Sequence, residues 1–119
     1  MRRVLVVESE QLLGKAILCL LAAQEDFDLF GFTPNTRAAL IAKINHIHPD
    51  VVVVDLASRF AHGLQHLPIY TRTNLCLILV NTEDNWVIID NKYRVLLTKS
   101  ADFVRLVHGD QPQAVLEGI

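Results

Sequence analysis

The sequence predicts a single α/β domain, residues 1–119, built on a five-stranded parallel sheet in the order 2-1-3-4-5. Short valine-rich apolar runs alternate along the chain with stretches of helical periodicity. This alternation indicates βαβ units and therefore parallel strands. A hydrophobic content of 51% and a charged content of 20% in 119 residues are enough to bury a core.

The first strand and helix are predicted from a change of periodicity near the N-terminus. Val4–Val7 is a short apolar run that ends in charge, which is typical of a buried strand. Ser9 can cap the helix that follows. The apolar residues of this helix recur at helical spacing, at Leu12, Leu13, Ala16, Ile17, Leu20 and Leu21.

A second strand and helix follow. Phe27–Phe32 is broken by Asp28 and Gly31, which indicates an edge strand. The next helix can be capped by Asn35 or Thr36. Proline disfavours helical backbone in the residue before it, so the helix ends at His48-Pro49. The apolar stripe of this helix consists of Ala39, Leu40, Ile44 and Ile47.

The central strand is predicted at Val51–Val54, where four valines closed by Asp55 leave no polar face. In the flavodoxin-like order 2-1-3-4-5, strands one and three are neighbours, and their carboxyl ends form the functional crevice. The tail from Asp110 to Ile119 has no clear pattern. The other predicted elements are a short helix near His62–Ile69, strands at Leu75–Val80 and Val95–Leu97, and a helix at Ala101–His108.

The connection between the last two strands is unusually short. Only 14 residues, Asn81–Arg94, lie between Val80 and Val95. A parallel crossover needs about a dozen residues at minimum, so the fourth helix is expected to be shortened or irregular. The segment NWVIIDNKY is also β-branched, and an extended path with a turn at Asp90-Asn91 competes with the helix.

Composition argues against several classes of function. The net charge of -2 gives no electrostatic bias toward nucleic acid, so no direct nucleic-acid binding is expected. No apolar run reaches the roughly 18 residues of a membrane span, and we expect a cytoplasmic protein without a membrane partner. Cys19 and Cys76 lie in apolar runs and are expected to be buried free thiols.

Polar residues gather at the predicted carboxyl ends of the strands. Glu8, with Ser9 and Glu10, follows the first strand, and Asp55 follows the third. Carboxylates in such a crevice can hold a small hard cation through oxygen ligands, or Asp55 can accept a phosphoryl group. In the alternative, purely structural interpretation, Asp55 forms an ion pair with Lys99. The remaining members of the expected site are Asn81, Thr82 and Lys99.

Four segments resemble the signature segments of response-regulator receiver domains: VLVVESEQLLGKAIL, PDVVVVDLA, LILVNTED and VLLTKSA. The resemblance runs from Arg3 to about Val107. It implies that Asp55 is the phospho-acceptor and that Lys99 is the lysine that neutralises the phosphoryl oxygens. Asn81 or Thr82 would donate a hydrogen bond to the phosphoryl group. Gly63 matches the glycine that opens the third helix of the family.

The chain also departs from the receiver pattern. Ser9 stands where the resemblance implies a second, metal-ligating carboxylate, so Mg2+ held by Glu8 and Asp55 is expected to bind weakly. Asn81 falls where the family has a hydroxyl residue, and Thr82 comes one position late. Leu96 occupies the place of an aromatic switch residue. The chain therefore resembles a partly degenerate receiver domain.

Three functional hypotheses remain open at this point. The first is a receiver domain in two-component phosphorelay signalling, not an enzyme, in which Asp55 accepts phosphate from a histidine kinase with Mg2+ as cofactor. The second is a pseudo-receiver that binds another signalling protein without phosphorylation. The third is a small flavodoxin-like ligand-binding protein or enzyme, which the lack of a glycine-rich phosphate loop disfavours. For either signalling role, we expect a homodimer or partner interface at Trp86–Tyr93 together with the predicted last strand, independent of phosphorylation.

Overall fold

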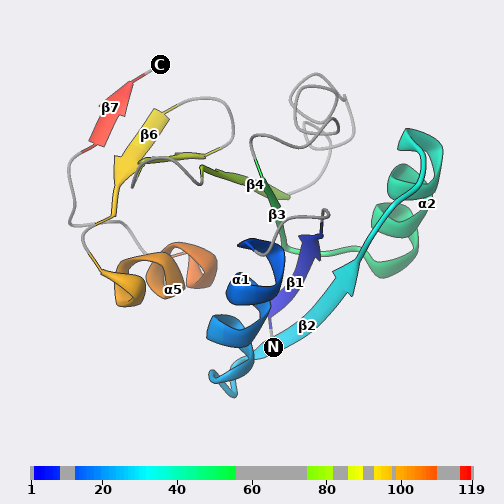
Figure 1. Ribbon diagram of the computed structural model, residues 1–119, viewed down its shortest axis with the longest axis horizontal. Helices are drawn as coiled ribbons and strands as arrows, with labels where there is room; N and C mark the ends of the chain where they lie inside the picture. Colours follow the sequence, from blue (N-terminus) through cyan, green and yellow to red (C-terminus); the bar gives the residue numbers. More distant parts are fainter. Residues whose placement is uncertain are drawn as a thin grey trace.

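The computed structural model of the chain describes residues 2–8, 13–55, 75–81, 86–89, 93–97, 99–109 and 116–118. These residues form an α/β fold with one mixed, seven-stranded sheet in the order β2-β1-β3-β4-β5-β6-β7 (Figure 1). The strands are β1 (Arg2–Val7), β2 (Phe27–Phe32), β3 (Val51–Asp55), β4 (Cys76–Val80), β5 (Trp86–Ile89), β6 (Tyr93–Leu96) and β7 (Leu116–Gly118). The helices are α1 (Leu13–Ala22), α2 (Arg37–Ile47) and α5 (Ser100–His108).

The first four strands in the sheet order, β2-β1-β3-β4, are all parallel and are called the parallel half below. β3 lies between β1 and β4, with Val51 beside Val4 and Cys76. Every residue of β3 is buried, which confirms that the valine run forms a central strand. The pairings predicted among the first four strands are also those observed, but the predicted last strand at Val95–Leu97 does not lie beside β4.

The rest of the sheet differs from the prediction and is called the hairpin half. β5 runs antiparallel to β4, β6 antiparallel to β5, and β7 antiparallel to β6. The prediction of a shortened helix is wrong for residues 86–89, which form a strand, as in the alternative extended path. The segment after β4 is too short to wrap a helix around the sheet comfortably, and its β-branched residues suit a strand beside β4. The sheet is consequently mixed and not a five-stranded parallel one.

Two core layers lie on the two faces of the sheet. The first, on the α1/α5 face, includes Ile17 of α1 and Phe103 of α5, packed with Val6, Val53 and residues of both halves. The second, on the α2 face, is built from α2 residues and the alternate residues of β1, β3 and β4. Its buried members are Leu5, Val7, Leu40, Ile44, Ile47, Val52, Val54, Leu77 and Leu79.

Arg2 and Arg3 hold the ends of helices on opposite faces of the sheet. Successive side chains of a strand point to opposite faces. The Arg2 Nε atom donates to the carbonyl of Val107 in α5 at 2.6 Å, and the Arg3 guanidinium donates to the carbonyl of Ile47 in α2 at 2.8 Å. Each arginine thus satisfies a C-terminal helix carbonyl and places a positive charge at the negative end of the helix dipole.

Local capping explains where α2 and α5 begin and end. Thr36 caps α2 as expected, because its hydroxyl accepts a hydrogen bond from the Ala39 N–H at 3.1 Å. α2 ends at His48, whose φ of 53° is left-handed, before Pro49. α5 ends at Gly109, whose φ of 90° is a conformation that favours glycine.

The cysteines do not lie where the apolar context predicted. Cys19 is exposed and Cys76 is half-buried, and both are free thiols. α1 is apolar on nearly all sides, and it turns Ile17 and Leu21 toward the sheet. Cys19 lies two positions after Ile17, about 200° further around the helix, and therefore faces outward. Among the residues that the structure describes, no helix has the length and apolar character to cross a membrane.

Candidate functional site

Three of the expected site residues follow neighbouring strands at one edge of the sheet. Val7 of β1 lies beside Val54 of β3, so the register carried one residue further places Glu8 beside Asp55. Asp55 in turn lies beside Val80, and Asn81 comes directly after it. The carboxyl ends of β1, β3 and β4 therefore bring Glu8, Asp55 and Asn81 to one edge, as the parallel strand order predicts.

Asp55 is the most buried of these polar residues. It is 5% exposed, and its Oδ2 atom is shielded from solvent. Its side chain follows Val51 and Val53 in the alternation of β3 and so points to the α1/α5 face. Burial of a carboxylate is costly, so a buried Asp at the end of a central strand marks a candidate functional position. Asp55 is therefore the centre of the candidate site.

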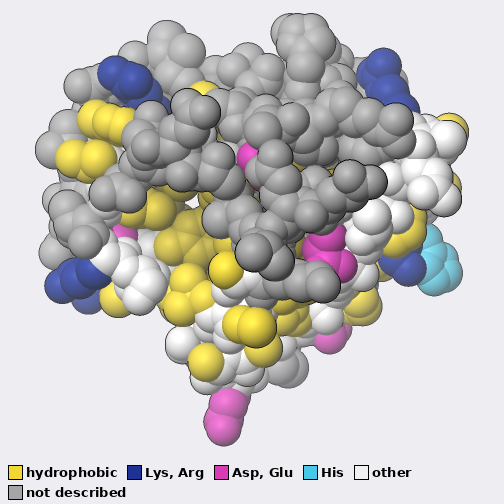
Figure 2. All heavy atoms as spheres, in the orientation of Figure 1, with side chains coloured by type: hydrophobic (Ala, Val, Ile, Leu, Met, Phe, Trp, Pro, Cys, Tyr) yellow, Lys and Arg dark blue, Asp and Glu magenta, His cyan; other side chains and the backbone are white. Residues whose placement is uncertain are grey.

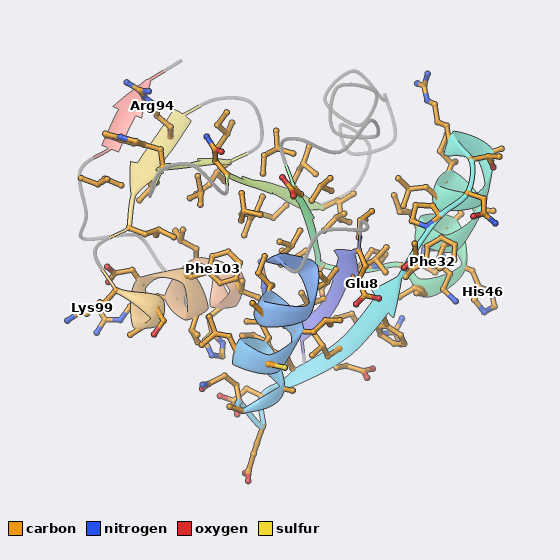
Figure 3. The ribbon with its side chains drawn as sticks, in the orientation of Figure 1. Glu8, Phe32, His46, Arg94, Lys99 and Phe103 are labelled. Atoms are coloured by element: carbon orange, nitrogen blue, oxygen red, sulfur yellow. The ribbon has the colours of Figure 1, made fainter. Side chains whose placement is uncertain are left out.

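Glu8 continues β1 but turns its side chain toward the edge strand β2. Its backbone N–H donates to the carbonyl of Phe32 at 2.8 Å. Its Oε2 atom lies 3.3 Å from the point where a Cβ on Gly31 would stand. Figure 3 shows Glu8 beside Phe32, on the side of β1 that faces β2. The carboxylate thus lies over β2, whereas Asp55 belongs to β3 on the other side of β1.

Lys99 does not join this group. β5 stands between β4 and β6, so the segment that follows β6 leaves the sheet two strands away from β4. Lys99 is exposed and begins α5, where its backbone N–H donates to the Asp102 carboxylate at 3.2 Å. In Figure 3, Lys99 lies at the left margin with its side chain pointing outward, whereas Glu8 lies near the middle of the view beside β1. The expected convergence of Glu8 and Lys99 is not observed.

The described carboxylates do not fit a shared Mg2+ ion. Mg2+ needs oxygen ligands at about 2.1 Å in near-octahedral geometry. Neighbouring strands are about 4.8 Å apart, so a carboxylate over β2 and another on β3 are separated by about two such spacings. In the described part of the chain, no group of three or more His, Cys, Asp or Glu side chains is placed to hold a metal ion.

The other expected site residues have a different status. Asn81 is half-buried and follows β4 directly. Ser9, Glu10 and Thr82 lie outside the described residues, as do Gly63 and the predicted helix near His62–Ile69.

A second candidate surface lies on the hairpin half, and the sequence indicated it only in part. Val87 and Ile89 of β5 are buried in the α1/α5 layer, so they do not form an exposed apolar surface. Trp86 and Ile88 alternate with them and are half-buried on the α2 face. Ile88 pairs with Arg94 of β6, whose side chain is exposed on the same face.

The Arg94 guanidinium lies over the ring of Trp86, with its central carbon 4.5 Å from the ring centroid. Leu96, directly opposite Trp86 in the register, is also half-buried. These four residues, Trp86, Ile88, Arg94 and Leu96, form a surface that we call the hairpin face. A tryptophan and an arginine stacked at a solvent-accessible position are residues that often anchor protein contacts. Sequence reasoning missed Arg94, because only the strand register reveals that it lies diagonally across from Trp86.

Comparison of the chain with protein-family models, with curated proteins and with solved structures found no match. The resemblance to receiver domains therefore rests on the four sequence segments alone.

Proposed function

We propose that this chain is a receiver-like signalling domain, a flavodoxin-type variant, that acts by binding another signalling protein and not by accepting a phosphoryl group. The observation that carries the proposal is the insertion of β5 between β4 and β6, with Lys99 exposed at the start of α5. A phosphoryl group on Asp55 would bring added negative charge to a buried position. The receiver resemblance implies that Lys99 would offset that charge, but Lys99 is exposed at the start of α5.

The hairpin face is the proposed contact surface. β5 and β6 bury Val87, Ile89 and Val95 on one side, and this holds the hairpin in place. The other side presents Trp86 and Arg94 in a stacked arrangement that needs little further ordering on binding. A rigid aromatic anchor beside an arginine is well suited to bind a protein partner.

A phosphorelay receiver is the second candidate, and the placement of Asp55 favours it. Asp55 ends the central parallel strand with Glu8 next to it in the register. This arrangement matches the receiver resemblance at its most specific segment, PDVVVVDL. In this alternative, a histidine kinase would be the partner and Asp55 the phospho-acceptor.

Beryllofluoride with Mg2+ distinguishes the two candidates, because it mimics a phosphoryl group on a carboxylate. We expect the backbone amide resonances of the full chain to remain unshifted at Asp55 and in the hairpin half. The matched control is Asp55→Asn, which removes the acceptor. Saturable shifts in the parent that are lost in Asp55→Asn would overturn the interaction-only proposal and favour the phosphorelay.

The contact surface is tested by immobilising the 119-residue chain and two variants and comparing the proteins that each form retains. Leu96→Asp places a charge on the hairpin face, and Arg105→Asp changes an exposed residue of α5 on the opposite side of the sheet. We expect proteins retained by the parent and by Arg105→Asp to be lost with Leu96→Asp. If the same proteins bind all three forms equally, the hairpin face is not the contact surface.

A further inference from the structure

The two edges of the sheet are unequal. β7 forms one edge with three residues, and β2 forms the other with six. Natural sheets protect their edges with very short strands, with lysine or with proline, because unpaired backbone groups recruit other strands. β7 is short, but β2 has the sequence FDLFGF, with no lysine or proline and with Asp28 as its single charge. Within the described residues, only β1 pairs with β2.

The hydrogen bond of Phe32 shows which backbone groups of β2 face outward. The Phe32 carbonyl accepts from the Glu8 N–H, so the backbone groups of Phe32 point toward β1. In a strand, these groups alternate between the two sides from one residue to the next. The N–H and C=O groups of Leu29 and Gly31 therefore point away from β1, at the open edge of the sheet.

We propose that β2 pairs antiparallel with β2 of a second copy of this chain, around a two-fold axis at Phe30. In this register, outward Leu29 faces outward Gly31 of the other copy, which forms a hydrogen-bonded pair on each side of the axis. Phe30 then lies opposite Phe30, and Asp28 opposite Phe32. A register centred on Asp28 would instead place two carboxylates opposite each other, which is unfavourable.

Charge complementarity selects this register over its neighbours. Phe30 and Phe32 pack against the α2 layer, and Asp28 points to the same face by the alternation of the strand. The Lys43 ammonium of α2 lies 5.3 Å from the centroid of the Phe32 ring. Asp28 of each copy, placed opposite Phe32 of the other, would thus lie beside Lys43 of that copy. The two-fold axis repeats this ion pair twice.

The surface beside β2 extends the contact. A stable protein interface buries about 800 Å2 on each partner, which is more than one strand edge supplies. Leu18 of α1 lies against Gly31, 3.0 Å from where a Cβ would stand, so α1 approaches the edge of the sheet closely. Cys19 and Ala22 are exposed on the same helix, and Figure 2 shows hydrophobic side chains gathered over α1. A two-fold axis through the strand pair brings the two α1 helices to the same face.

Charge reversal tests the proposal in the full chain, with light scattering and sedimentation over a range of protein concentrations. Asp28→Lys places two like charges at each predicted pair, and Lys43→Asp does the same with opposite sign. We expect each single variant to raise the dissociation constant of the dimer by about tenfold or more, since both symmetric pairs change from attraction to repulsion. The double variant D28K/K43D restores the pairs with their signs exchanged and should regain the parent mass.

Arg105→Asp is the control for Lys43→Asp, because it makes the same charge change at an exposed residue of α5, on the opposite face of the sheet from Lys43. It should keep the parent mass, and circular dichroism should show every variant folded. A monomeric parent, or single variants that remain dimeric, would overturn the proposal. It would also be overturned by a folded double variant that stays monomeric. The failure of this proposal leaves the proposed function intact, because the beryllofluoride test concerns Asp55 and the capture test concerns the hairpin face.

Discussion

The parallel half and the hairpin half of the sheet bury their strands in different ways. β3 is buried at every residue, because α1 and α5 cover one of its faces and α2 covers the other. In β5 the burial alternates, with Val87 and Ile89 in the core and Trp86 and Ile88 half-exposed. β3 is packed on both faces and presents no exposed side chain to a partner. The outer face of β5 is only partly covered, since Ile88 packs against the α2 layer and Trp86 is half-buried, so the proposed contact surface lies on the hairpin half.

The largest expected effect is on stability. The same Ile→Ala substitution at three positions compares buried residues of both halves with a half-buried residue of the hairpin half. Ile78 of β4 is 0% exposed and Ile89 of β5 is 5% exposed, whereas Ile88 is half-buried. Ile78→Ala and Ile89→Ala should each lower the free energy of unfolding by about 2–5 kcal/mol, the cost of a buried cavity. Ile88→Ala should lower it by about 1 kcal/mol, because less apolar area leaves the core.

Urea denaturation gives the free energy of unfolding of all three variants, which differ only in the position of the same Ile→Ala substitution. Equal losses for Ile88→Ala and Ile89→Ala would mean that both faces of β5 support the fold, and the distinction between the two halves would fail.

The parallel half could be predicted from sequence because its residues carry unambiguous signals. Four valines in succession leave no polar face, and only a central parallel strand buries both sides of such a run. Thr36 and His48-Pro49 mark the limits of α2 through capping and proline geometry, and these are local effects. The positions of Glu8 and Asp55 at the carboxyl edge followed from the strand order.

The hairpin half could not be assigned uniquely, because Trp86–Ile89 contains no polar residue to mark a strand or helix period. Whether these residues form a strand depends on pairing with Ile78 and Leu79 of β4, a long-range contact that the local sequence does not encode. The prediction that Lys99 lies in the same crevice as Asp55 failed for the same reason. Once β5 occupies the position next to β4, the residues after β6 leave the sheet farther from Asp55.

An intermediate effect on stability is expected at the two adjacent arginines of β1. Each of them binds the C-terminal end of a different helix. Arg2 holds α5, which packs on the hairpin half as well, and Arg3 holds α2 on the parallel half. Replacing either with methionine removes a charged hydrogen bond and should lower the free energy of unfolding by about 1–2 kcal/mol. In amide hydrogen exchange, Arg2→Met should speed exchange in α5, and Arg3→Met in α2. Faster exchange in both helices for both variants would argue that the halves are not held separately.

The smallest effect on stability is expected at the hairpin face. Arg94→Gln removes the guanidinium that lies over the Trp86 ring, a contact between an exposed and a half-buried residue. Such a cation–π pair contributes about 0.5–1 kcal/mol, so the unfolding midpoint should hardly move. The fluorescence of Trp86, the single tryptophan, should nevertheless change, because the charged guanidinium over its ring is gone. A loss of several kcal/mol would show that Arg94 belongs to the structural core.

The most direct test of the central claim is exposure of the chain to a small phosphodonor, such as acetyl phosphate with Mg2+, followed by intact-mass measurement. Asp55 is buried, and Lys99 is exposed at the start of α5 with β5 inserted between β4 and β6. We predict that neither the parent nor Asp55→Asn, treated in the same way, gains the mass of a phosphoryl group over its untreated form. A phosphoryl adduct on the parent that is lost in Asp55→Asn would contradict the account and identify the chain as a working phospho-acceptor.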